Sequence, residues 1–438
     1  MTRPSVAAVL IFAAGIPLTL AIVIHDAALW PFSLNFGALV LASVLLDYLI
    51  ALPKRAVAFT VDLPERIYIG ETDVLTLTFA PSRHRRSVVI DILVNQSGPA
   101  APQQIVAARS LPGEAWSVAI PLAPYRRGHI AVGSVSLRWR GPLRLVETIV
   151  SVPVDKSVDV VPNVRALHKT GLAFIAEDAH FGIKAQRRKG EGTEFESLRE
   201  YVPGLDHRFI DWKRSAKHRR LLSKEFETER NHQIILAFDT GHLMQEPING
   251  ISRLDHAINA GLLLTWVSLK CGDLAGSYAF DAAVRHYTPP GRGMVTFARV
   301  QHASANLAYH PYETNFTLGL AEINVRLKRR ALIVLFTEFV DSVSAELLID
   351  SLDHLANRHA VIFVTLRDQD FEADIDKVPA DFTDVARAVI AQDFLQERAV
   401  VFERINRLGV SCLDVPVGGL SVELLNRYMR IKQRGLIG

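Results

Sequence analysis

From residue 233 onward, continuous apolar runs alternate with segments of helical periodicity, and this alternation constrains the fold more than any other feature. The apolar runs are QIILAF, LAGSYAF, ALIVLF, AVIFVTL and GVSCLDV. Strands that are apolar along their whole length are typical of sheets buried on both faces, and the intervening helices allow neighbouring strands to run parallel. The sequence therefore predicts an α/β fold with a doubly wound, mostly parallel sheet.

Helical periodicity covers six segments: Ser252 to Leu269, Met294 to Leu307, Leu318 to Lys328, Ala345 to Arg358, Asp393 to Arg407 and Val422 to Arg434. We expect the segment VRHYTPP to form the arm of a hairpin. In sheets of this kind, ligands bind beyond the carboxyl ends of the strands. Asp239 follows QIILAF and Glu338 follows ALIVLF, so we expect any site of this domain to lie near them.

Two long apolar runs lie near the start of the chain. Val6 to Ile24 carries no charge, and Phe32 to Leu52 carries only Asp47, near its end. Each is close to the ~20 residues that a helix needs to cross a hydrocarbon core. We expect a transmembrane helical hairpin over residues 1–55, with the Asp47 carboxylate reaching the membrane interface. A cleaved signal peptide is the alternative for the first run, but no small-residue cleavage site follows it.

The charges that flank the two runs predict their orientation. Arg3 precedes the first run, Lys54 and Arg55 follow the second, and the turn between them has no Lys or Arg. The positive-inside rule therefore places both ends of the hairpin, and the soluble domains, in the cytoplasm. The two cysteines, Cys271 and Cys412, have no CxxC spacing, and this fits a reducing compartment.

Short alternating runs separated by Gly, Pro and Ser turns fill residues 56–163 and predict a small antiparallel β-sandwich domain. A period of two buries Leu75, Leu77 and Phe79 on one face of their strand. The segment contains no catalytic constellation, so we expect a spacer or a partner-binding role. A linker and signature segment at 164–230 then leads to the α/β domain at 231–438.

The signature segment contains EFESLREYVPG, FIDWKRSAK and LLSKEFETE, and its pattern predicts a loop, a short helix and a strand before the first buried strand. This ordered series resembles the "domain of unknown function 58" family. The resemblance implies a von Willebrand factor A-like domain in a bacterial inner-membrane protein. It also implies partnership with a MoxR-type AAA+ ATPase and a client protein, in protein maturation or complex assembly.

The resemblance further implies a divalent-metal site, because von Willebrand factor A domains bind such ions through an Asp-x-Ser-x-Ser loop, a Thr and a third-loop Asp. Asp239, Thr314 and Glu338 stand at three of these positions, whereas Gly241 and Leu243 replace the two serines. Mg²⁺ requires nearly octahedral oxygen ligation, and two ligands are absent. We expect a degenerate site with at most weak Mg²⁺ binding and no other cofactor. In the simpler interpretation, Asp239 hydrogen-bonds backbone groups of its own loop.

Charged and aromatic residues of the signature segment are the candidate partner-binding residues: Arg199, Tyr201, Asp211, Trp212, Lys213, Arg214, Lys217 and Arg220. Such a basic run could bind phosphates, but Glu225, Glu227 and Glu229 follow it, and acids beside bases are typical of protein surfaces. The net charge of +3 over 438 residues does not call for a nucleic-acid partner. We therefore favour protein docking, with Trp212 either at the docking surface or as an anchor in a buried seam.

Sequence motifs for enzymes are absent. The chain has no GxxxxGK[ST] phosphate loop, no GxSxG nucleophile elbow, no HExxH and no CxxC pair. We therefore predict a membrane-anchored adaptor and not an enzyme. The alternative is a metal-dependent adhesion-type module or hydrolase that uses Asp239, Thr314 and Glu338.

Overall fold

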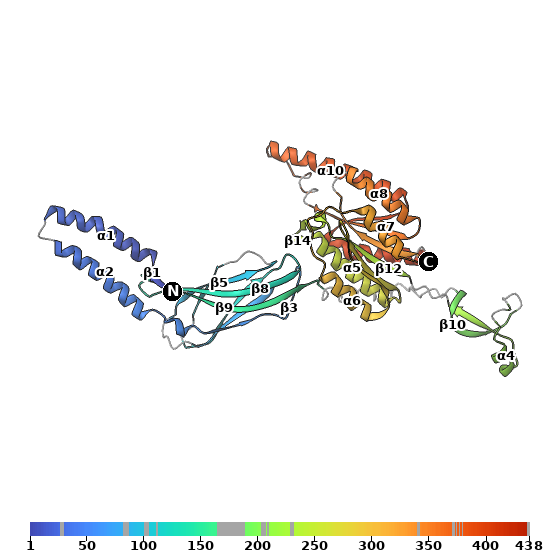
Figure 1. Ribbon diagram of the computed structural model, residues 1–438, viewed down its shortest axis with the longest axis horizontal. Helices are drawn as coiled ribbons and strands as arrows, with labels where there is room; N and C mark the ends of the chain where they lie inside the picture. Colours follow the sequence, from blue (N-terminus) through green and yellow to red (C-terminus); the bar gives the residue numbers. More distant parts are fainter. Residues whose placement is uncertain are drawn as a thin grey trace. The chain divides into compact units, whose positions relative to one another are not determined.

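The structure, a computed structural model, comprises two compact units, Met1–Pro162 and Asn163–Gly438 (Figure 1). The residues described are 1–26, 30–81, 87–99, 105–110, 113–163, 189–202, 207, 210–227, 232–339, 342–369, 373, 375, 377–378 and 380–435. Within these ranges, the side chains of 189–199, 224–227 and 342–344 are outside the description.

Two apolar helices open the first unit, as the sequence predicts. α1 spans Val6–His25 and α2 spans Trp30–Ile50, and both are long and apolar enough to cross a membrane. The hydroxyl of Ser5 caps α1 by accepting a hydrogen bond from the backbone N–H of Ala8 at 3.2 Å. The cytoplasmic orientation of the soluble domains stays a prediction.

The remainder of the first unit is built from strands β1 Thr2–Pro4, β2 Phe59–Asp62, β3 Arg66–Tyr68, β4 Asp73–Phe79, β5 Val89–Ser97, β6 Ile105–Arg109, β7 Trp116–Leu122, β8 Gly128–Arg140 and β9 Val146–Val161. One sheet has the order β1-β9-β8-β5-β6, with β3 beside β9, and the other has the order β2-β4-β7. All of these pairs are antiparallel except β3 with β9. Leu75, Leu77 and Phe79 are buried, which confirms the predicted face of β4.

Asp47 is fully buried among protein groups, which the sequence did not predict, and its place at a membrane interface stays a prediction. The carboxylate accepts hydrogen bonds from the backbone N–H groups of Leu143 at 2.7 Å, Leu145 at 2.8 Å and Val146 at 2.9 Å. Three donors compensate the desolvation of the carboxylate. Gly141 permits this approach, because a Cβ there would collide with the Asp47 carboxylate. The end of α2 is therefore bonded to the loop between β8 and β9.

The second unit contains the predicted α/β domain. Its strands are β12 Gln233–Asp239, β15 Leu274–Phe280, β16 Val284–Gly291, β17 Ala331–Phe336, β18 Ala360–Arg367 and β19 Ser411–Pro416. Its longer helices are α5 Arg253–Lys270, α6 Gly293–Ala305, α7 Phe316–Arg326, α8 Ser342–Ala356, α10 Phe382–Arg407 and α11 Leu420–Arg434. The sheet order is β16-β15-β12-β17-β18-β19, parallel except for the edge strand β16.

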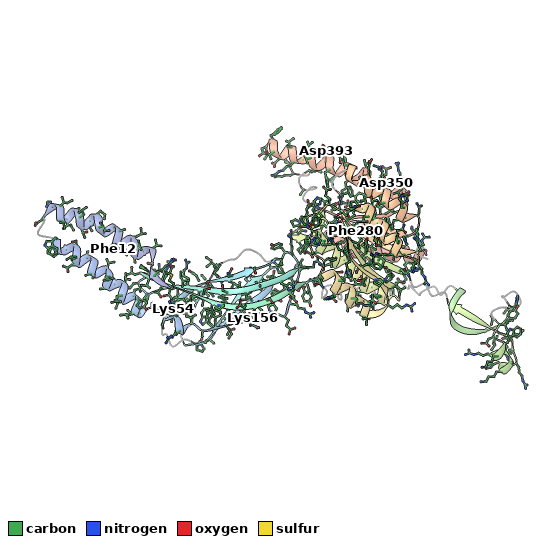
Figure 2. All side chains as sticks on the ribbon, in the orientation of Figure 1. Phe12, Lys54, Lys156, Phe280, Asp350 and Asp393 are labelled. Carbon is green, nitrogen blue, oxygen red and sulfur yellow. The ribbon has the colours of Figure 1, made fainter. Side chains whose placement is uncertain are left out.

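Two apolar clusters cover the two faces of this sheet. Ile234 and Leu236 face the cluster formed with α5, α6 and α11, whereas Ile235 and Ala237 face the cluster formed with α7, α8 and α10. Phe280 lies among the dense side chains of this domain (Figure 2). The helices on both faces confirm the predicted doubly wound arrangement. α10 begins at Phe382, eleven residues before the predicted start at Asp393.

Candidate functional site

Two acidic residues lie at the carboxyl ends of the neighbouring strands β12 and β17. These strands are parallel, and Phe238 pairs with Phe336, so both strands end at the same edge of the sheet. Asp239 closes β12, and Glu338 follows β17 by two residues. Asp239 is 1% exposed and Glu338 is 4% exposed, so each carboxylate must find its partners inside the protein.

Asp239 is hydrogen-bonded through both carboxylate oxygens. Oδ1 accepts from the Thr314 hydroxyl at 2.6 Å and from the backbone N–H of Gly241 at 2.8 Å. Oδ2 accepts from the Thr337 hydroxyl at 2.6 Å. Thr314 is thus brought to Asp239 from 75 residues away, and Thr337 comes from the end of β17. Thr337 was not among the residues predicted from the sequence. Its position directly before Glu338, at the end of a buried strand, could have indicated it.

Gly241 leaves the space that the Thr314 hydroxyl occupies. A Cβ on Gly241 would collide with Thr314 Oγ1 and would lie 3.1 Å from Asp239 Oδ1. A serine at this position would therefore clash with the Thr314 hydroxyl instead of adding an oxygen beside it. Leu243, at the second replaced serine, lies in the short 3-10 helix η4 (His242–Gln245) and offers no oxygen.

Burial raises the pKa of Asp239 to about 6, although bonds from Thr314, Thr337 and Gly241 act in the opposite direction. A second buried carboxylate, Asp281, contributes to the rise. Desolvation would by itself raise the pKa of Asp281 as well, but hydrogen bonds from Arg285, the Ala283 N–H and Thr240 together outweigh it, and the pKa is lowered. The site therefore combines Asp281, whose pKa is lowered, with Asp239, whose pKa is about 6.

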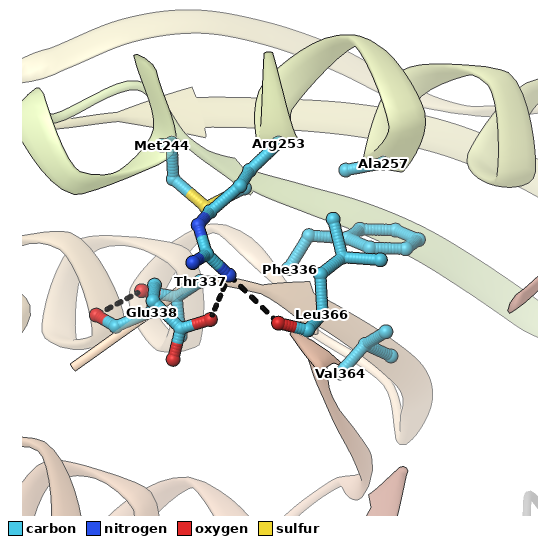
Figure 3. Close-up of a pocket in the computed structure, with 8 residues that line it drawn as sticks. All are labelled: Met244, Arg253, Ala257, Phe336, Thr337, Glu338, Val364 and Leu366. Carbon is cyan, nitrogen blue, oxygen red and sulfur yellow. Dashed lines mark hydrogen bonds and ion pairs between the residues drawn. The ribbon is translucent and has the colours of Figure 1, made fainter. Parts of the chain in front are cut away.

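Glu338 is bound to two buried arginines. Arg253, at the start of α5, donates to Oε2 at 2.9 Å, and Arg398, from the middle of α10, donates to Oε1 at 2.6 Å. Arg253 also donates to the backbone oxygen of Leu366 at 2.7 Å, as Figure 3 shows. Arg398 reaches further, to Asp414 in β19, at 3.0 Å. These ion pairs and the hydrogen bond to Leu366 connect three neighbouring strands, β17, β18 and β19, with two helices.

We refer to Asp239, Thr314, Thr337, Glu338, Arg253 and Arg398 together as the strand-end network. Thr337 and Glu338, with Arg253 and Met244, line one side of a narrow crevice whose other side is apolar (Figure 3). The structure gives Asp239 and Glu338 separate partners, hydroxyl groups for the first and guanidinium groups for the second. In the described part of the chain, no group of three or more His, Cys, Asp or Glu is placed to hold a metal ion. A divalent cation at Asp239 would have to displace the hydroxyl hydrogen bonds and could not draw on Glu338 without releasing two arginines.

The signature segment forms a small hairpin of its own. β10 (Lys189–Glu200) pairs antiparallel with β11 (Leu222–Glu227), and α4 (Trp212–His218) lies between them in sequence. The predicted short helix and strand are confirmed, whereas β10 was not predicted. Asp211 caps α4 by accepting from the backbone N–H of Arg214 at 3.0 Å, and the Ser215 hydroxyl accepts from Leu222 N–H at 2.9 Å. These local bonds fix the helix on its hairpin.

Exposed positions of α4 and of the turn that follows it carry most of the candidate partner-binding residues. We call the exposed set the signature surface: Trp212, Lys213, Arg214, Lys217 and Arg220. Trp212 is 67% exposed, so it is not buried within its own hairpin. Arg220 lies 3.9 Å from Glu200, and both side chains are largely exposed. Tyr201 is half-buried, with its N–H bonded to the Leu221 carbonyl.

Arg199 belongs to β10 and pairs with Ser223, but its side chain lies outside the described residues.

A comparison with protein families finds a match over the part of the chain that contains the signature surface and most of the strand-end network. The family described as "Protein of unknown function DUF58" matches residues 197–391, a range that contains the signature surface, Asp239, Thr314 and Glu338. Over these residues the chain resembles that family. The comparison with curated proteins finds no match.

Several solved structures show a limited likeness to the chain. Trypsin-activated alpha-2-macroglobulin from Escherichia coli is 18% identical, with 24% of this chain and 7% of that chain covered and a TM-score of 0.19. Proximal thread matrix protein 1 from the mussel byssus is 12% identical over 44% of this chain and 45% of that chain, with a TM-score of 0.27. The conserved hypothetical protein BatB from Bacteroides thetaiotaomicron is 11% identical over 41% of this chain and 98% of that chain, with a TM-score of 0.23. This chain therefore spans less than half of the first two structures.

Proposed function

We propose that this protein is a membrane-anchored adaptor whose signature surface docks a MoxR-type AAA+ ATPase or its client. In this proposal, α1 and α2 anchor the chain in a bacterial inner membrane, the first unit is a β-sandwich spacer, and the α/β domain is von Willebrand factor A-like. The proposal assigns no catalytic step to the strand-end network. Its carboxylates serve the fold, because their oxygens bond to neighbouring side chains.

The exposure of Trp212 among basic side chains is the observation that carries this proposal. A tryptophan that is 67% exposed contributes little to the core of its own hairpin. Trp and Arg are the residue types enriched at the energetic centres of protein interfaces. The bonds of Asp211 and Ser215 hold the helix in place without Trp212. The surface is therefore available to a partner at little cost to the local fold.

A triple substitution tests the proposal. Changing Arg214, Lys217 and Arg220 to Ser removes three charges from the signature surface of the full-length protein in detergent. We expect pull-down of a co-expressed MoxR-type ATPase to be lost, while the thermal melt stays unchanged. The matched control changes Lys328, Arg329 and Arg330 to Ser, because these three exposed residues lie in the α/β domain, away from the signature segment in sequence.

Loss of binding in the first variant alone supports docking at the signature surface. If both folded variants bind the ATPase as well as wild type does, the signature surface is not the docking site. If both variants lose binding to the same extent, the loss results from the change in net charge and not from this surface.

The proposed orientation has a separate test. A reporter fused after Gly438 should behave as cytoplasmic, and one inserted at Ala27 should show the opposite behaviour. A periplasmic signal from the carboxyl terminus would contradict both the helical hairpin and a cytosolic ATPase partner.

The alternative, a metal-dependent adhesion-type module or hydrolase, requires a cation at Asp239, Thr314 and Glu338. A ligand that binds only the native state stabilises it by about 2.7 kcal/mol at a hundredfold excess over Kd. Because the hydroxyls and arginines already occupy these carboxylates, we expect Mg²⁺ or Mn²⁺ to shift the melting temperature little. A large shift that Asp239→Ala abolishes would favour the alternative.

A further inference from the structure

Helix α10 exposes large apolar side chains along its first three turns. The exposed fractions are 86% for Phe382, 44% for Val385, 52% for Val389 and 65% for Ile390. Residues spaced three, four and seven apart share one face of a helix, so these side chains form a stripe. Figure 1 shows the first part of α10 extending beyond the other helices of its domain. Exposed apolar surface of this kind on a folded domain marks an interaction site.

The second half of the same helix behaves differently. The buried residues of α10 are Ala391, at the end of its third turn, and Arg398, Val401 and Ile405, in its second half. The helix is therefore fixed to its domain by its second half, and its first three turns extend from that base. This explains why the sequence periodicity predicted only the later part, from Asp393.

Charge indicates what covers the stripe. Between residues 382 and 397, α10 carries Asp384, Asp393 and Glu397 against Arg387 alone. Helices that lie on membranes have a polar face rich in Lys and Arg, which is the opposite balance. The stripe therefore suits a protein surface that combines apolar and basic character. Asp393 lies four residues after Val389 and so extends the apolar face with an acid.

A groove of this character lies at the opposite edge of the sheet. It has a volume of about 830 Å³, and one wall is β16 while the other is one face of α6. The α6 positions that line it recur at helical spacing: Val295, Ala298, Arg299, His302, Ala303 and Asn306. Tyr287, Pro289 and Leu307 add apolar surface.

The groove is basic and has no acid in its lining. Arg285, Arg299 and three histidines line it, without any Asp or Glu. Arg285 is already bonded to Asp281, at 2.8 Å. Arg299 is exposed and has no ion pair with any residue in the described part of the chain, so its charge is available to an incoming carboxylate.

The helix and the groove are separated within one molecule. The groove is on β16, whereas α10 leads into β19, and these strands are the two edges of the six-stranded sheet. Five strand spacings of about 4.8 Å put the two edges about 24 Å apart. The second half of α10 packs on α8 and β19 and so fixes the helix at the far edge. The groove is therefore open to the α10 of another molecule.

We propose that the first turns of α10 dock in the β16–α6 groove of a second copy of this chain. Phe382, Val385 and Val389 cover the apolar part of the groove, and Asp393 approaches Arg299. The contact joins different surfaces of the two copies, so it links molecules head to tail, into a ring or a row. Asp393 beside the stripe and Arg299 in the groove fix which surfaces meet.

Cross-linking between two differently tagged full-length copies in detergent tests the contact. One copy carries Val389→Cys and the other Ala298→Cys, both with the exposed Cys271 changed to Ser. Burial raises the pKa of the Cys412 thiol to about 12, so that residue stays unreactive toward a bismaleimide. We expect a product that carries both tags. The control replaces Val389→Cys by Leu347→Cys, an exposed position on α8, and should give none.

A charge exchange provides the second measurement. Arg299→Asp should weaken self-association by at least about tenfold, and adding Asp393→Arg to the same chain should restore it. The molar mass in detergent, measured by light scattering over a concentration series, gives the association constant. The proposal is overturned if the wild-type protein stays monomeric, if Arg299→Asp associates as well as wild type, or if Val389→Cys copies cross-link only to each other.

Discussion

The strand-end network and the signature surface contain the same kinds of charged residue in opposite settings. In the network, Glu338 meets two arginines that are buried with it, and Asp239 meets two hydroxyls. On the signature surface, the basic side chains and Trp212 face outward. Charges that are satisfied internally contribute to stability, whereas exposed charges contribute little to it. The comparison thus separates a structural part of the matched region from a part that we propose binds a partner.

The largest effect on stability should come from Glu338→Ala. Removal of this carboxylate leaves Arg253 and Arg398 buried without their shared partner, and such losses typically cost about 3–5 kcal/mol. Urea unfolding of the full-length protein in detergent measures the change. The control is Glu346→Ala, which breaks an exposed pair with Arg404 at 3.7 Å and should change stability by less than about 1 kcal/mol. If Glu338→Ala and Glu346→Ala changed the free energy of unfolding equally, the network would have no special structural role.

A pH-dependent effect of somewhat smaller size should come from Asp239. Its pKa rises from 3.8 when unfolded to about 6 when folded, so between these values the native state binds more protons than the unfolded state. The free energy of unfolding therefore falls as pH rises through this window, by at most about 3 kcal/mol, and stays lower above it. Asp239→Asn lacks this contribution, so its stability relative to wild type should rise between pH 4 and pH 6.

The exposed Asp350→Asn is the control for this titration, and its unfolding free energy should run parallel to that of wild type. Parallel curves for Asp239→Asn as well would show that the buried carboxylate does not titrate in this window.

The next effect should come from Gly241→Ser. The added side chain meets the Thr314 hydroxyl, and overpacking of this kind typically costs about 1–3 kcal/mol. The control is Gly418→Ser, because a Cβ at Gly418 meets no atom within 4 Å. Thermal melts with and without Mg²⁺ measure both stability and metal binding. If Mg²⁺ stabilised Gly241→Ser, the serine would be acting as a metal ligand, and this would contradict the predicted clash with Thr314.

The smallest effect should come from Arg220→Ser on the signature surface. The pair with Glu200 is 3.9 Å long and exposed, so its loss should change the unfolding free energy by less than about 0.5 kcal/mol. A destabilisation comparable to that of Glu338→Ala would mean that the signature surface is structural too, and the contrast between the two regions would fail.

Sequence periodicity predicted the elements of the α/β domain because each apolar strand and amphipathic helix indicates its own burial locally. The partners of individual charges could not be predicted in this way. Arg253 and Arg398 lie 85 and 60 residues from Glu338, and the backbone groups that bind Asp47 are about one hundred residues away from it. Only the folded chain brings such groups together.

Residues that fit two different environments were the other features that the sequence did not place. A tryptophan among charges, such as Trp212, fits either a buried seam or an interface, and the sequence does not distinguish them. The first turns of α10 have their apolar residues outside the domain core, so their periodicity did not point to a neighbouring element. Both exposed features became visible only when the exposed fraction of each side chain was known.

Binding and stability measured together on Trp212→Ser and Asp239→Asn test the central claim most directly. The experiment titrates a purified MoxR-type ATPase against each full-length variant in detergent and records its thermal melt at pH 7. We predict that Trp212→Ser weakens binding at least about tenfold with an unchanged melt, as expected for an interface hot spot. Asp239→Asn should change the melt and leave the dissociation constant unchanged. Unaltered binding by Trp212→Ser, together with weakened binding by a folded Asp239→Asn, would contradict the account.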